Sequence, residues 1–339
     1  MITPLDQFSQ ACLPAIEAEL RRAVAPAGGP DLEELHSMLA YHLGWEGQGA
    51  GANASGKRIR PLLVLLSCAA AGGNWQAALP AAAAIELIHN FSLIHDDIQD
   101  NSELRRGRPT VWVKWGIPQA INAGDAMFTL AHLSILRLQD TVSAGIALQA
   151  AGILQQTCLE LTQGQYRDIS YEDRYDLTID DYWPMIRGKT AALIAASAEI
   201  GALAAQAGHE VCSAYRTFGN ALGLAFQAQD DLLGIWGDSA LTGKSAESDL
   251  VTGKKSLPVL YGLSQKGWFA TRWHMAPITP QDVTLLARQL EIEGARQYTQ
   301  AKADELTEQA LKALQSANPQ GEAGQALVEL ANWLLGRNS

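Results

Sequence analysis

Apolar residues recur at helical spacing along most of the chain, and alternating patterns of β-branched residues are nearly absent. Side chains repeat about every 3.6 residues in a helix but every two residues in a strand, so this pattern predicts an all-α protein. The segments expected to be helical are 4–24, 31–43, 59–72, 77–101, 118–139, 142–166, 179–207, 213–234, 256–263, 280–293, 295–317 and 322–335.

One stretch interrupts this pattern. Gly44–Gly56 is rich in Gly, Ala and Asn, but composition is similar on both sides, so we interpret it as a surface loop. With 339 residues, 47% of them hydrophobic, the chain can bury a large core. We expect a single domain over residues 1–339, with N-terminal helices and the loop in 1–55, a motif-bearing core in 56–263 and C-terminal helices in 264–339.

Charge and the chain start limit the partners and the compartment. The chain has 25 basic and 36 acidic side chains, a net charge of −11, and no long Lys/Arg run, which argues against nucleic-acid binding. The first residues lack the pattern of a signal peptide and the four cysteines form no CxxC pair, so we expect a reduced, cytoplasmic protein. No membrane span is expected, because 62–73 is too short and 191–205 contains Glu199.

Three aspartates lie where a helix end disfavours them. Asp96, Asp97 and Asp100 end an apolar helical segment, although the last turn of a helix prefers cations. No Lys or Arg occurs between Arg60 and Arg105 to neutralise them along the helix. Asp96 and Asp100 are four residues apart, so both carboxylates project from one face and could share a cation, and hard oxygen ligands favour Mg²⁺.

Asp230 and Asp231 repeat this situation, with no Lys or Arg between Arg216 and Lys244. A lone pair of aspartates is most simply a solvated helix end. Two clusters that each break a local rule without visible compensation indicate a functional site instead. Zinc is not favoured, because the seven histidines form no pattern typical of a zinc site.

Cations are scarce, yet several gather in short motifs near these aspartates in sequence. They lie in Gly56–Pro61 (GKRIRP), in Arg105–Thr110 (RRGRPT), at Arg187 and Lys189 before Thr190, and at Lys244, Lys254 and Lys255. Arg58, Arg108 and Lys255 are interpreted as solubilising surface charges. The other cations, together with two carboxylate clusters, suit diphosphates bridged by Mg²⁺.

A polar stripe runs along the first acidic helix. His89, Ser92, Asp96 and Asp100 are spaced 3, 4 and 4 residues apart among apolar residues. Such a stripe is typical of a cavity lining, and an apolar pocket with a charged mouth predicts an amphiphilic substrate, a diphosphate joined to a hydrocarbon. Bound Mg²⁺ would also turn the acidic clusters into a surface that attracts anions.

At this point the motifs resemble a known family. Ser92–Asp100 (SLIHDDIQD) and Phe226–Asp231 (FQAQDD) are similar to the two aspartate-rich motifs of trans-isoprenyl diphosphate synthases, or polyprenyl synthetases, and most like those of geranylgeranyl diphosphate synthases. The resemblance also includes Gly56–Pro61, Glu86–His89, Arg105–Thr110, Gly164–Gln165, Gly188–Thr190 and Asp249–Pro258. It implies a bundle of antiparallel helices around a deep central cavity, a homodimer, and Mg²⁺, expected as three ions.

The resemblance also implies substrates and roles. The substrates would be isopentenyl diphosphate and an allylic diphosphate, which is dimethylallyl, geranyl or farnesyl diphosphate. The implied metal ligands are Asp96, Asp100 and Asp230, supported by Asp97 and Asp231. The implied contacts to the allylic diphosphate are Arg105, Lys189, Gln227, Lys244 and Lys254, and those to isopentenyl diphosphate are Lys57, Arg60, His89 and Arg106. The residues expected to be catalytic are Asp96, Asp100, Asp230, Lys189 and Thr190.

The implied reaction is a head-to-tail condensation. Mg²⁺ and the cations stabilise the departing diphosphate, so that the allylic C–O bond ionises and the double bond of isopentenyl diphosphate attacks the cation. A proton then leaves to the released diphosphate, and apolar walls exclude water. Two features depart from the family pattern: the third acidic position of the second motif is Gly234, with Asp238 an open candidate to offset it, and the Gly44–Gly56 loop is longer than usual, without an assigned role.

Product length is expected to depend on Phe91 and Ser92, the residues five and four before the first motif. Phe91 followed by a small residue resembles the synthases that make C20 products, with C15 as the next choice. Five residues at about 100° place Phe91 roughly 140° from Asp96 around the helix. This role therefore rests on the resemblance, and the alternative is ordinary core packing.

Two other functions stay open from the sequence. A class I terpene cyclase also ionises an allylic diphosphate, but it needs no second diphosphate site, so Lys57, Arg60 and Arg106 favour condensation. A non-catalytic subunit of a heteromeric synthase can lose its aspartates, whereas this chain has both sets.

Overall fold

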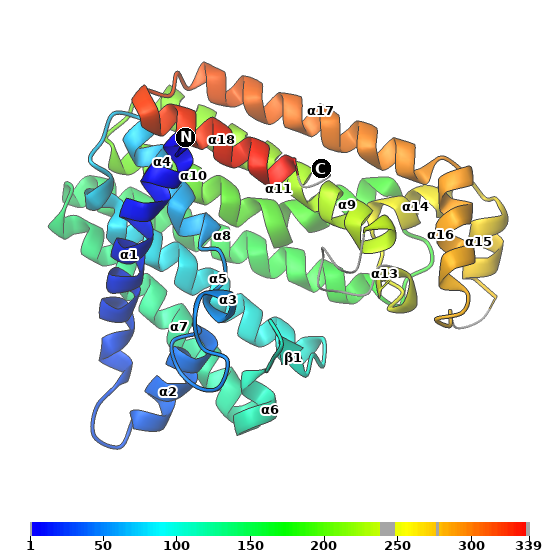
Figure 1. Ribbon diagram of the computed structural model, residues 1–339, viewed down its shortest axis with the longest axis horizontal. Helices are drawn as coiled ribbons and strands as arrows, with labels where there is room; N and C mark the ends of the chain where they lie inside the picture. Colours follow the sequence, from blue (N-terminus) through cyan, green and yellow to red (C-terminus); the bar gives the residue numbers. More distant parts are fainter. Residues whose placement is uncertain (1, 238–247, 276–277, 337–339) are drawn as a thin grey trace. The chain divides into compact units, whose positions relative to one another are not determined.

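The chain folds almost entirely into helices, as predicted. The computed structural model describes residues 2–237, 248–275 and 278–336 (Figure 1). Within these ranges the regular β-structure is one two-stranded hairpin. Contacts divide the chain into two compact units: the first contains Met1–Gln156, Ala196–Tyr215 and Ala317–Glu329, and the second contains Thr157–Ala195, Arg216–Ser316 and Leu330–Ser339. The single domain expected from the sequence stays a prediction.

The first unit is built around a long buried helix, α5. Its elements are α1 (Pro4–Val24), η1 (Ala25–Ala27), α2 (Glu33–His42), α3 (Ala52–Ser55), α4 (Ile59–Ala70), η2 (Trp75–Ala78), α5 (Leu79–Gln99), β1 (Leu104–Arg105), β2 (Arg108–Pro109), α6 (Val111–Trp115), α7 (Ile117–Leu136) and η3 (Arg137–Asp140). Helix α5 packs along α7 and also contacts α1 and α4. Pro80 lies in its first turn, and the small side chains of Ala81–Ala84 are fully buried, which allows these helices to approach closely.

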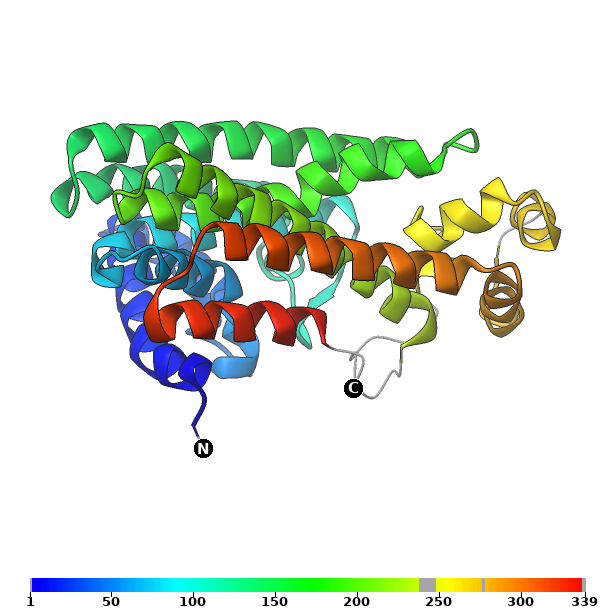
Figure 2. The ribbon, with the colours of Figure 1, turned by 90° about the horizontal axis from the view of Figure 1, so that it is seen from above.

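The second unit has its own core. Its elements are α9 (Ile179–Ile186), η4 (Arg187–Ala191), α13 (Ser248–Val251), α14 (Leu257–Ser264), α15 (Trp268–Trp273), α16 (Val283–Ile292) and α17 (Ala295–Ser316). Helix α14 packs against α9, α15 and α17, and Val259, Phe269 and Leu290 are buried together in the core. Gly294 (φ +89°) lies at the corner between α16 and α17, both orange in Figure 2. Four helices have residues in both units: α8 (Ala144–Tyr171), α10 (Ala192–Ala204), α11 (His209–Trp236) and α18 (Gly321–Leu335).

The predicted helices agree with the structure to within a few residues, with one correction. Segment 4–24 is helical over the predicted residues, where Thr3 and Asp6 form a capping box. Segment 179–207, predicted as one helix, is interrupted by η4, which is a π turn. The pattern also missed the hairpin and the short helices α3, α6, α13 and α15, because elements of a few residues cannot display a 3.6-residue period.

The described residues include one long apolar helix and four buried cysteines. In the described part of the chain, one helical stretch, Trp75–Gln99, is long and apolar enough to span a membrane, and 67% of its most apolar window is buried within the protein. It is not one of the two stretches considered from the sequence, and its burial against other helices is that of a core helix. All four cysteines are free and buried, as expected.

Candidate active site

The first aspartate cluster lies at the C-terminal end of α5. Asp100 caps this helix, and its N–H donates to the Asp96 carbonyl at 2.8 Å. Asp97 is only 2% exposed, whereas Asp96 is half-buried and Asp100 is exposed. The i and i+4 aspartates thus face a different environment from the aspartate between them.

A hairpin directly after α5 brings Arg105 to Asp97. Strands β1 and β2 pair antiparallel, with Arg105 opposite Arg108. The turn residues Arg106 and Gly107 both have positive φ values, 53° and 74°, as a type I′ turn requires. Gly107, followed closely by Pro109, is the sequence signal that could have indicated a turn here.

Asp97 therefore has a cationic partner, and the interpretation of this carboxylate as unpaired is wrong. Arg105 Nε lies 2.9 Å from both Asp97 oxygens, and Arg105 Nη2 lies 2.7 Å from Oδ1. Burial raises the pKa of Asp97, and the hydrogen bonds from Arg105 oppose this shift. The sequence search missed the pair because it considered cations within the helix, whereas Arg105 comes from the hairpin.

Arg60 and His89 form a second pair in this unit. Arg60 Nη1 lies 3.2 Å from His89 Nε2. Because a guanidinium can only donate, Nε2 must accept, so the ring is neutral and its proton is on Nδ1. Burial and then the charges of nearby arginines, Arg60 foremost, lower the pKa of His89 well below its usual 6.5. Lys57, which precedes Arg60 by three residues in sequence and directly follows the Gly-rich loop, is exposed.

Arg58 is not a surface charge, so its predicted solubilising role is wrong. Its side chain is 3% exposed and donates to Glu17 Oε1 at 2.6 Å and to Glu86 Oε1 at 2.8 Å. A third hydrogen bond reaches the Leu43 carbonyl at 3.1 Å. Buried charges are tolerated when they are paired in this way.

Arg108 and Lys255 were also predicted to be solubilising surface charges, and this prediction is wrong too, because each is only 8% exposed. Lys255 donates to the Glu172 carbonyl at 3.2 Å and to the Gly253 carbonyl at 3.4 Å. Arg108 donates to carbonyls of the Gly-rich loop. Sequence alone does not reveal this burial, because the partners are backbone atoms that any residue provides.

In the second unit, Lys189 and Thr190 lie in the π turn η4. Helix α8 approaches this turn closely because two glycines lack side chains. A Cβ atom on Gly164 would collide with the Lys189 backbone, and one on Gly188 would lie 2.9 Å from the Gly164 Cα. Isolated π turns often occur at functional sites. This one contains Lys189 and Thr190, which are both predicted site residues.

Hydrogen bonds connect the π turn to the second aspartate cluster. Lys189 forms an ion pair with Asp168 of α8. Thr190 Oγ1 donates to Gln227 Oε1 at 2.8 Å, and Gln227 Nε2 donates to Asp231 Oδ1 at 2.9 Å. The structure therefore brings Lys189, Thr190, Gln227 and Asp231 together, and Asp168 is a member that the sequence analysis missed.

Asp231 is buried and has several partners, so it too was wrongly interpreted as unpaired. The Tyr182 hydroxyl and the Leu257 N–H donate to its Oδ2 at 2.7 and 2.9 Å. Lys254 Nζ lies 3.8 Å from Oδ1. Burial raises the pKa of Asp231, and Lys254 is the strongest group that opposes the shift.

Asp249 occupies the space of the missing third acidic side chain. Position 234, four residues after the exposed Asp230, is Gly, and a Cβ atom there would collide with Asp249 Oδ2. The carboxylate absent from position 234 is thus replaced by one from α13, which sequence spacing did not predict. Asp238 and Lys244, which were also considered, lie outside the described residues.

Phe91 lies in an aromatic cluster between α5 and α7. Its ring centroid is 5.0 Å from that of Phe128 and 5.4 Å from that of His95. Ser92 Oγ donates to the His89 carbonyl at 2.8 Å. This environment agrees with core packing for Phe91, and the role of both residues in product length stays a prediction.

The aspartates fit a metal that is shared with a substrate. Among the described residues, no group of three His, Cys, Asp or Glu side chains could hold a metal ion. Mg²⁺ seldom uses such a cage, because it keeps several waters and takes one or two carboxylates together with substrate phosphates. Asp96 and Asp100 on one face of α5 provide two such carboxylates, and Asp230 provides another in the second unit.

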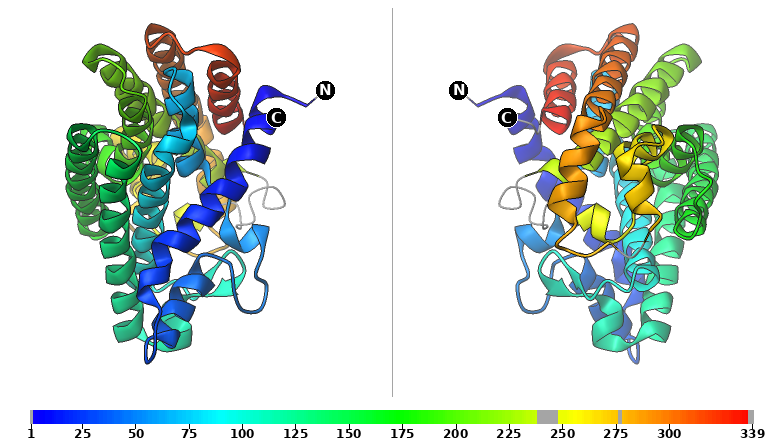
Figure 3. Two further views of the ribbon diagram at one scale, coloured as in Figure 1. Left: turned by 90° about the vertical axis from the view of Figure 1, so that its left-hand side faces the viewer. Right: turned by 90° about the vertical axis from the view of Figure 1, so that its right-hand side faces the viewer.

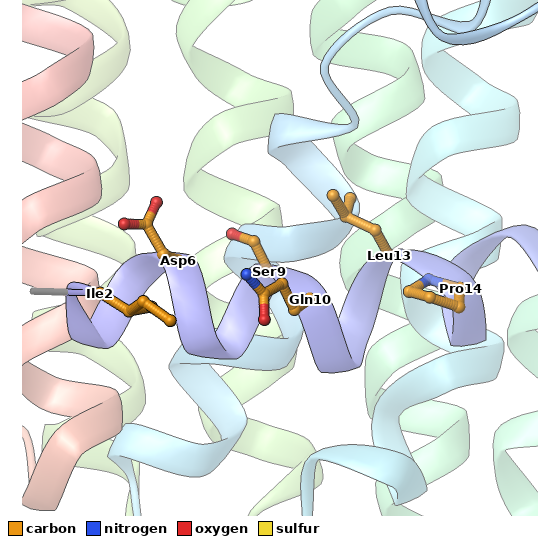
Figure 4. Close-up of a pocket in the computed structure, with 6 residues that line it drawn as sticks. All are labelled: Ile2, Asp6, Ser9, Gln10, Leu13 and Pro14. Carbon is orange, nitrogen blue, oxygen red and sulfur yellow. The ribbon is translucent and has the colours of Figure 1, made fainter.

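Two hollows on the surface lack a group of carboxylates and cations of the kind predicted for the site. One, of about 430 Å³, lies along α1 and is lined by Ile2, Asp6, Ser9, Gln10, Leu13 and Pro14 (Figure 4). Its one carboxylate, Asp6, already caps the helix. The other, of about 700 Å³, lies in the second unit near Tyr175, Asp180 and His274 and contains none of the predicted site residues.

Similarity to known proteins decides the family. The family model described as polyprenyl synthetase matches residues 50–272. The chain belongs to the polyprenyl synthetase family. This range contains both aspartate clusters, Lys57, the hairpin and the π turn. The chain is therefore a prenyltransferase, as the motifs indicated.

Two relatives from Mycobacterium tuberculosis are similar over most of their length. The (2E,6E)-farnesyl diphosphate synthase is 38% identical over 315 residues, which cover 90% of this chain and 87% of the relative. The geranylgeranyl diphosphate synthase is 41% identical over 292 residues, which cover 84% and 83%.

Solved structures extend the family assignment to the fold. A polyprenyl synthetase from Streptomyces coelicolor has a TM-score of 0.87 at 35% identity and covers 99% of this chain and 100% of its own. A polyprenyl synthase from Caulobacter crescentus, complexed with calcium and isoprenyl diphosphate, has a TM-score of 0.83 at 28% identity and covers 100% and 99%. The all-α isoprenoid synthase fold is thus confirmed.

Proposed function

We propose that this protein is a short-chain synthase that condenses isopentenyl diphosphate with an allylic diphosphate and releases diphosphate. The observation that carries the proposal is the arrangement of its carboxylates. In each cluster an exposed or half-buried aspartate adjoins a buried one that holds cationic or amide groups. Relatives named farnesyl and geranylgeranyl diphosphate synthases support a C15 or C20 product.

Isopentenyl diphosphate is proposed to bind to cations of the first unit. Lys57, Arg60 and Arg106 contact its phosphate oxygens. Neutral His89 accepts a hydrogen bond from Arg60 and so fixes the direction of the guanidinium. A protonated His89 could not do this, because both of its ring nitrogens would donate.

The allylic diphosphate is proposed to bind Arg105, Lys189, Thr190, Gln227, Lys244 and Lys254. Lys254 stays charged in this role: although burial alone lowers its pKa, Asp231 and Asp249 raise it above its usual value. Asp97 and Asp231 position Arg105 and Gln227 rather than bind the metal directly, since both oxygens of each accept hydrogen bonds from the protein.

Mg²⁺, expected as three ions, is proposed to be held by Asp96, Asp100 and Asp230. When bound, it neutralises negative charge on the diphosphate as the C–O bond breaks. The cationic side chains bind the remaining phosphate oxygens, and the apolar residues of α5 keep water from the allylic cation.

Two substitutions and one control test this division of roles. Asp96→Ala should abolish turnover, whereas Asp125→Ala, which removes a solvent-exposed carboxylate on α7, should not. Lys57→Ala should raise the KM for isopentenyl diphosphate about tenfold or more while leaving the KM for the allylic substrate nearly unchanged. Retained activity in Asp96→Ala, or equal changes in both KM values for Lys57→Ala, would contradict the proposal.

Product length is proposed to be set by Phe91 and Ser92, with C20 favoured over C15. Phe91→Ala removes a ring that packs on Phe128, and the vacated space should admit a longer hydrocarbon. Chromatography of the dephosphorylated products should then show longer chains than the wild type. An unchanged product distribution would leave Phe91 with core packing alone.

We further propose that the protein is a cytoplasmic homodimer. Helix α7 supports the dimer, because four of its apolar residues are 43–51% exposed, namely Ile117, Ile121, Leu133 and Leu136. An exposed apolar row of this kind is typical of an interface. Light scattering should give twice the chain mass, and Ile121→Glu should yield monomers; a monomeric wild type would contradict the proposal.

A further inference from the structure

The guanidinium of Arg108 binds backbone carbonyls of the Gly-rich loop and of Tyr41 just before it. Its Nη1, Nη2 and Nε donate to the carbonyls of Tyr41, Glu46 and Gln48 at 2.9, 2.6 and 3.0 Å. The guanidinium also lies 4.0 Å above the Tyr41 ring. Residues 46–53 are exposed, yet Arg108 beneath them is buried. The loop is therefore a cover that the guanidinium holds in place.

The glycines of this loop allow its backbone to turn, and they also allow it to pack closely on Tyr41 and Arg108. A Cβ atom on Gly47 (φ +83°) would lie 2.8 Å from the Tyr41 ring and 3.2 Å from Arg108 Nη2. The loop also closes on itself, since the Gly51 N–H donates to the Gly44 carbonyl at 3.0 Å. A cavity of only about 20 Å³ remains near Tyr41 and Arg108, which is room for a single water.

The other end of the loop is held by the neighbouring arginine of the hairpin. Arg106 Nη1 donates to the Ala54 carbonyl at 2.7 Å, and the absence of a side chain at Gly56 leaves room for this guanidinium. Lys57 follows directly. Figure 1 and the left view of Figure 3 show the loop around α3 beside the hairpin, as these hydrogen bonds require.

We propose that Arg108 is a positioning residue for isopentenyl diphosphate, acting through the Gly44–Gly56 loop on Lys57 and Arg106. The hairpin fixes the spacing of Arg106 and Arg108, and each binds one part of the loop, so Lys57 leaves the loop at a defined point beside Arg106. This inference rests on the proposed function, in which Lys57 and Arg106 bind that substrate.

Substitution of Arg108 should separate the two substrates. Arg108→Gln releases the loop carbonyls and should raise the KM for isopentenyl diphosphate about tenfold, with less than a twofold change in the KM for the allylic diphosphate. Arg108→Lys keeps the charge but cannot hold three carbonyls in a fixed fork, so its effect should be intermediate. Arg137→Gln, which breaks an ion pair with Glu19 in the same unit, is the control and should affect thermal stability only.

A glycine pair tests the same point from the loop side. Gly47→Ala should also raise the KM for isopentenyl diphosphate, whereas Gly72→Ala should not. Both positions have similar φ values, +83° and +88°, but a Cβ atom at Gly72 meets nothing within 4 Å. This pair decides the matter if Arg108→Gln does not fold.

The outcomes distinguish this inference from the proposed function. A wild-type protein that does not elongate allylic diphosphates overturns the proposed function. An active wild type whose Gly47→Ala and folded Arg108 variants have unchanged KM values, or equal rises for both substrates, overturns the positioning role of Arg108.

Discussion

At the scale of residues, neighbouring aspartates have different environments. Asp96 and Asp230 are half-buried or exposed, whereas Asp97 and Asp231 are buried in hydrogen bonds. A pair of adjacent aspartates at a helix end thus presents one carboxylate outward and uses the other to fix its surroundings. Sequence identified these aspartates but not this difference, because Arg105 and Tyr182 reach them from other elements.

Gly234→Asp should be harmful although it restores an acidic motif. The new side chain would collide with Asp249, and the two like charges would repel each other. We expect a loss of roughly 1–3 kcal/mol in the free energy of unfolding. Chemical denaturation measures this. The double substitution with Asp249→Ala should recover part of the loss, and a single variant as stable as the wild type would show that Asp249 does not occupy this space.

Acid should destabilise the protein below about pH 6.5. Burial, then neighbouring arginines, lower the pKa values of His42 and His89 well below 6.5. The unfolded chain therefore binds protons that the folded chain does not, and stability falls as pH drops below 6.5, by up to about 1.4 kcal/mol per pH unit for each histidine. His42→Gln should make the decline between pH 7 and 5 less steep. An unchanged slope in urea titrations would contradict this assignment.

At the scale of elements, sequence predicted the long helices, in which burial of one face makes apolar residues recur about every 3.6 positions. Helix α1 matches its predicted residues, and α5 and α11 are close, because many turns display the pattern. The π turn at Lys189 was not predictable in this way, since apolar residues continue on both sides of it. The turn lies against α8 at Gly164, a contact that a linear pattern does not reveal.

Gly164→Ala should displace the π turn and lower kcat at least tenfold, because its methyl group would collide with the Lys189 backbone. Gly152→Ala on the same helix is a matched control, since a Cβ atom there meets nothing within 4 Å. That control should keep its activity and gain up to about 1 kcal/mol of stability. Steady-state kinetics and thermal unfolding of both variants make the comparison. Equal activity in the two variants would contradict a catalytic role for this turn.

At the scale of the whole molecule, a net charge of −11 taken alone argues against strongly anionic substrates. The family assignment reverses this conclusion, because the acidic clusters suit Mg²⁺ and the scarce cations lie near them. Family motifs in the sequence were sufficient to predict the fold class and reaction. They could not predict that Arg58, Arg108 and Lys255 are buried, because backbone carbonyls from distant residues take part in holding each of them.

The most direct measurement is incubation of the purified protein with Mg²⁺, isopentenyl diphosphate and each of the C5, C10 and C15 allylic diphosphates, followed by chromatography of the products. We predict elongated linear prenyl diphosphates of C15 or C20, release of diphosphate, and no product when EDTA removes the metal. Cyclic hydrocarbon without chain extension would instead indicate a terpene cyclase. No turnover with any of the three primers would contradict the proposed function.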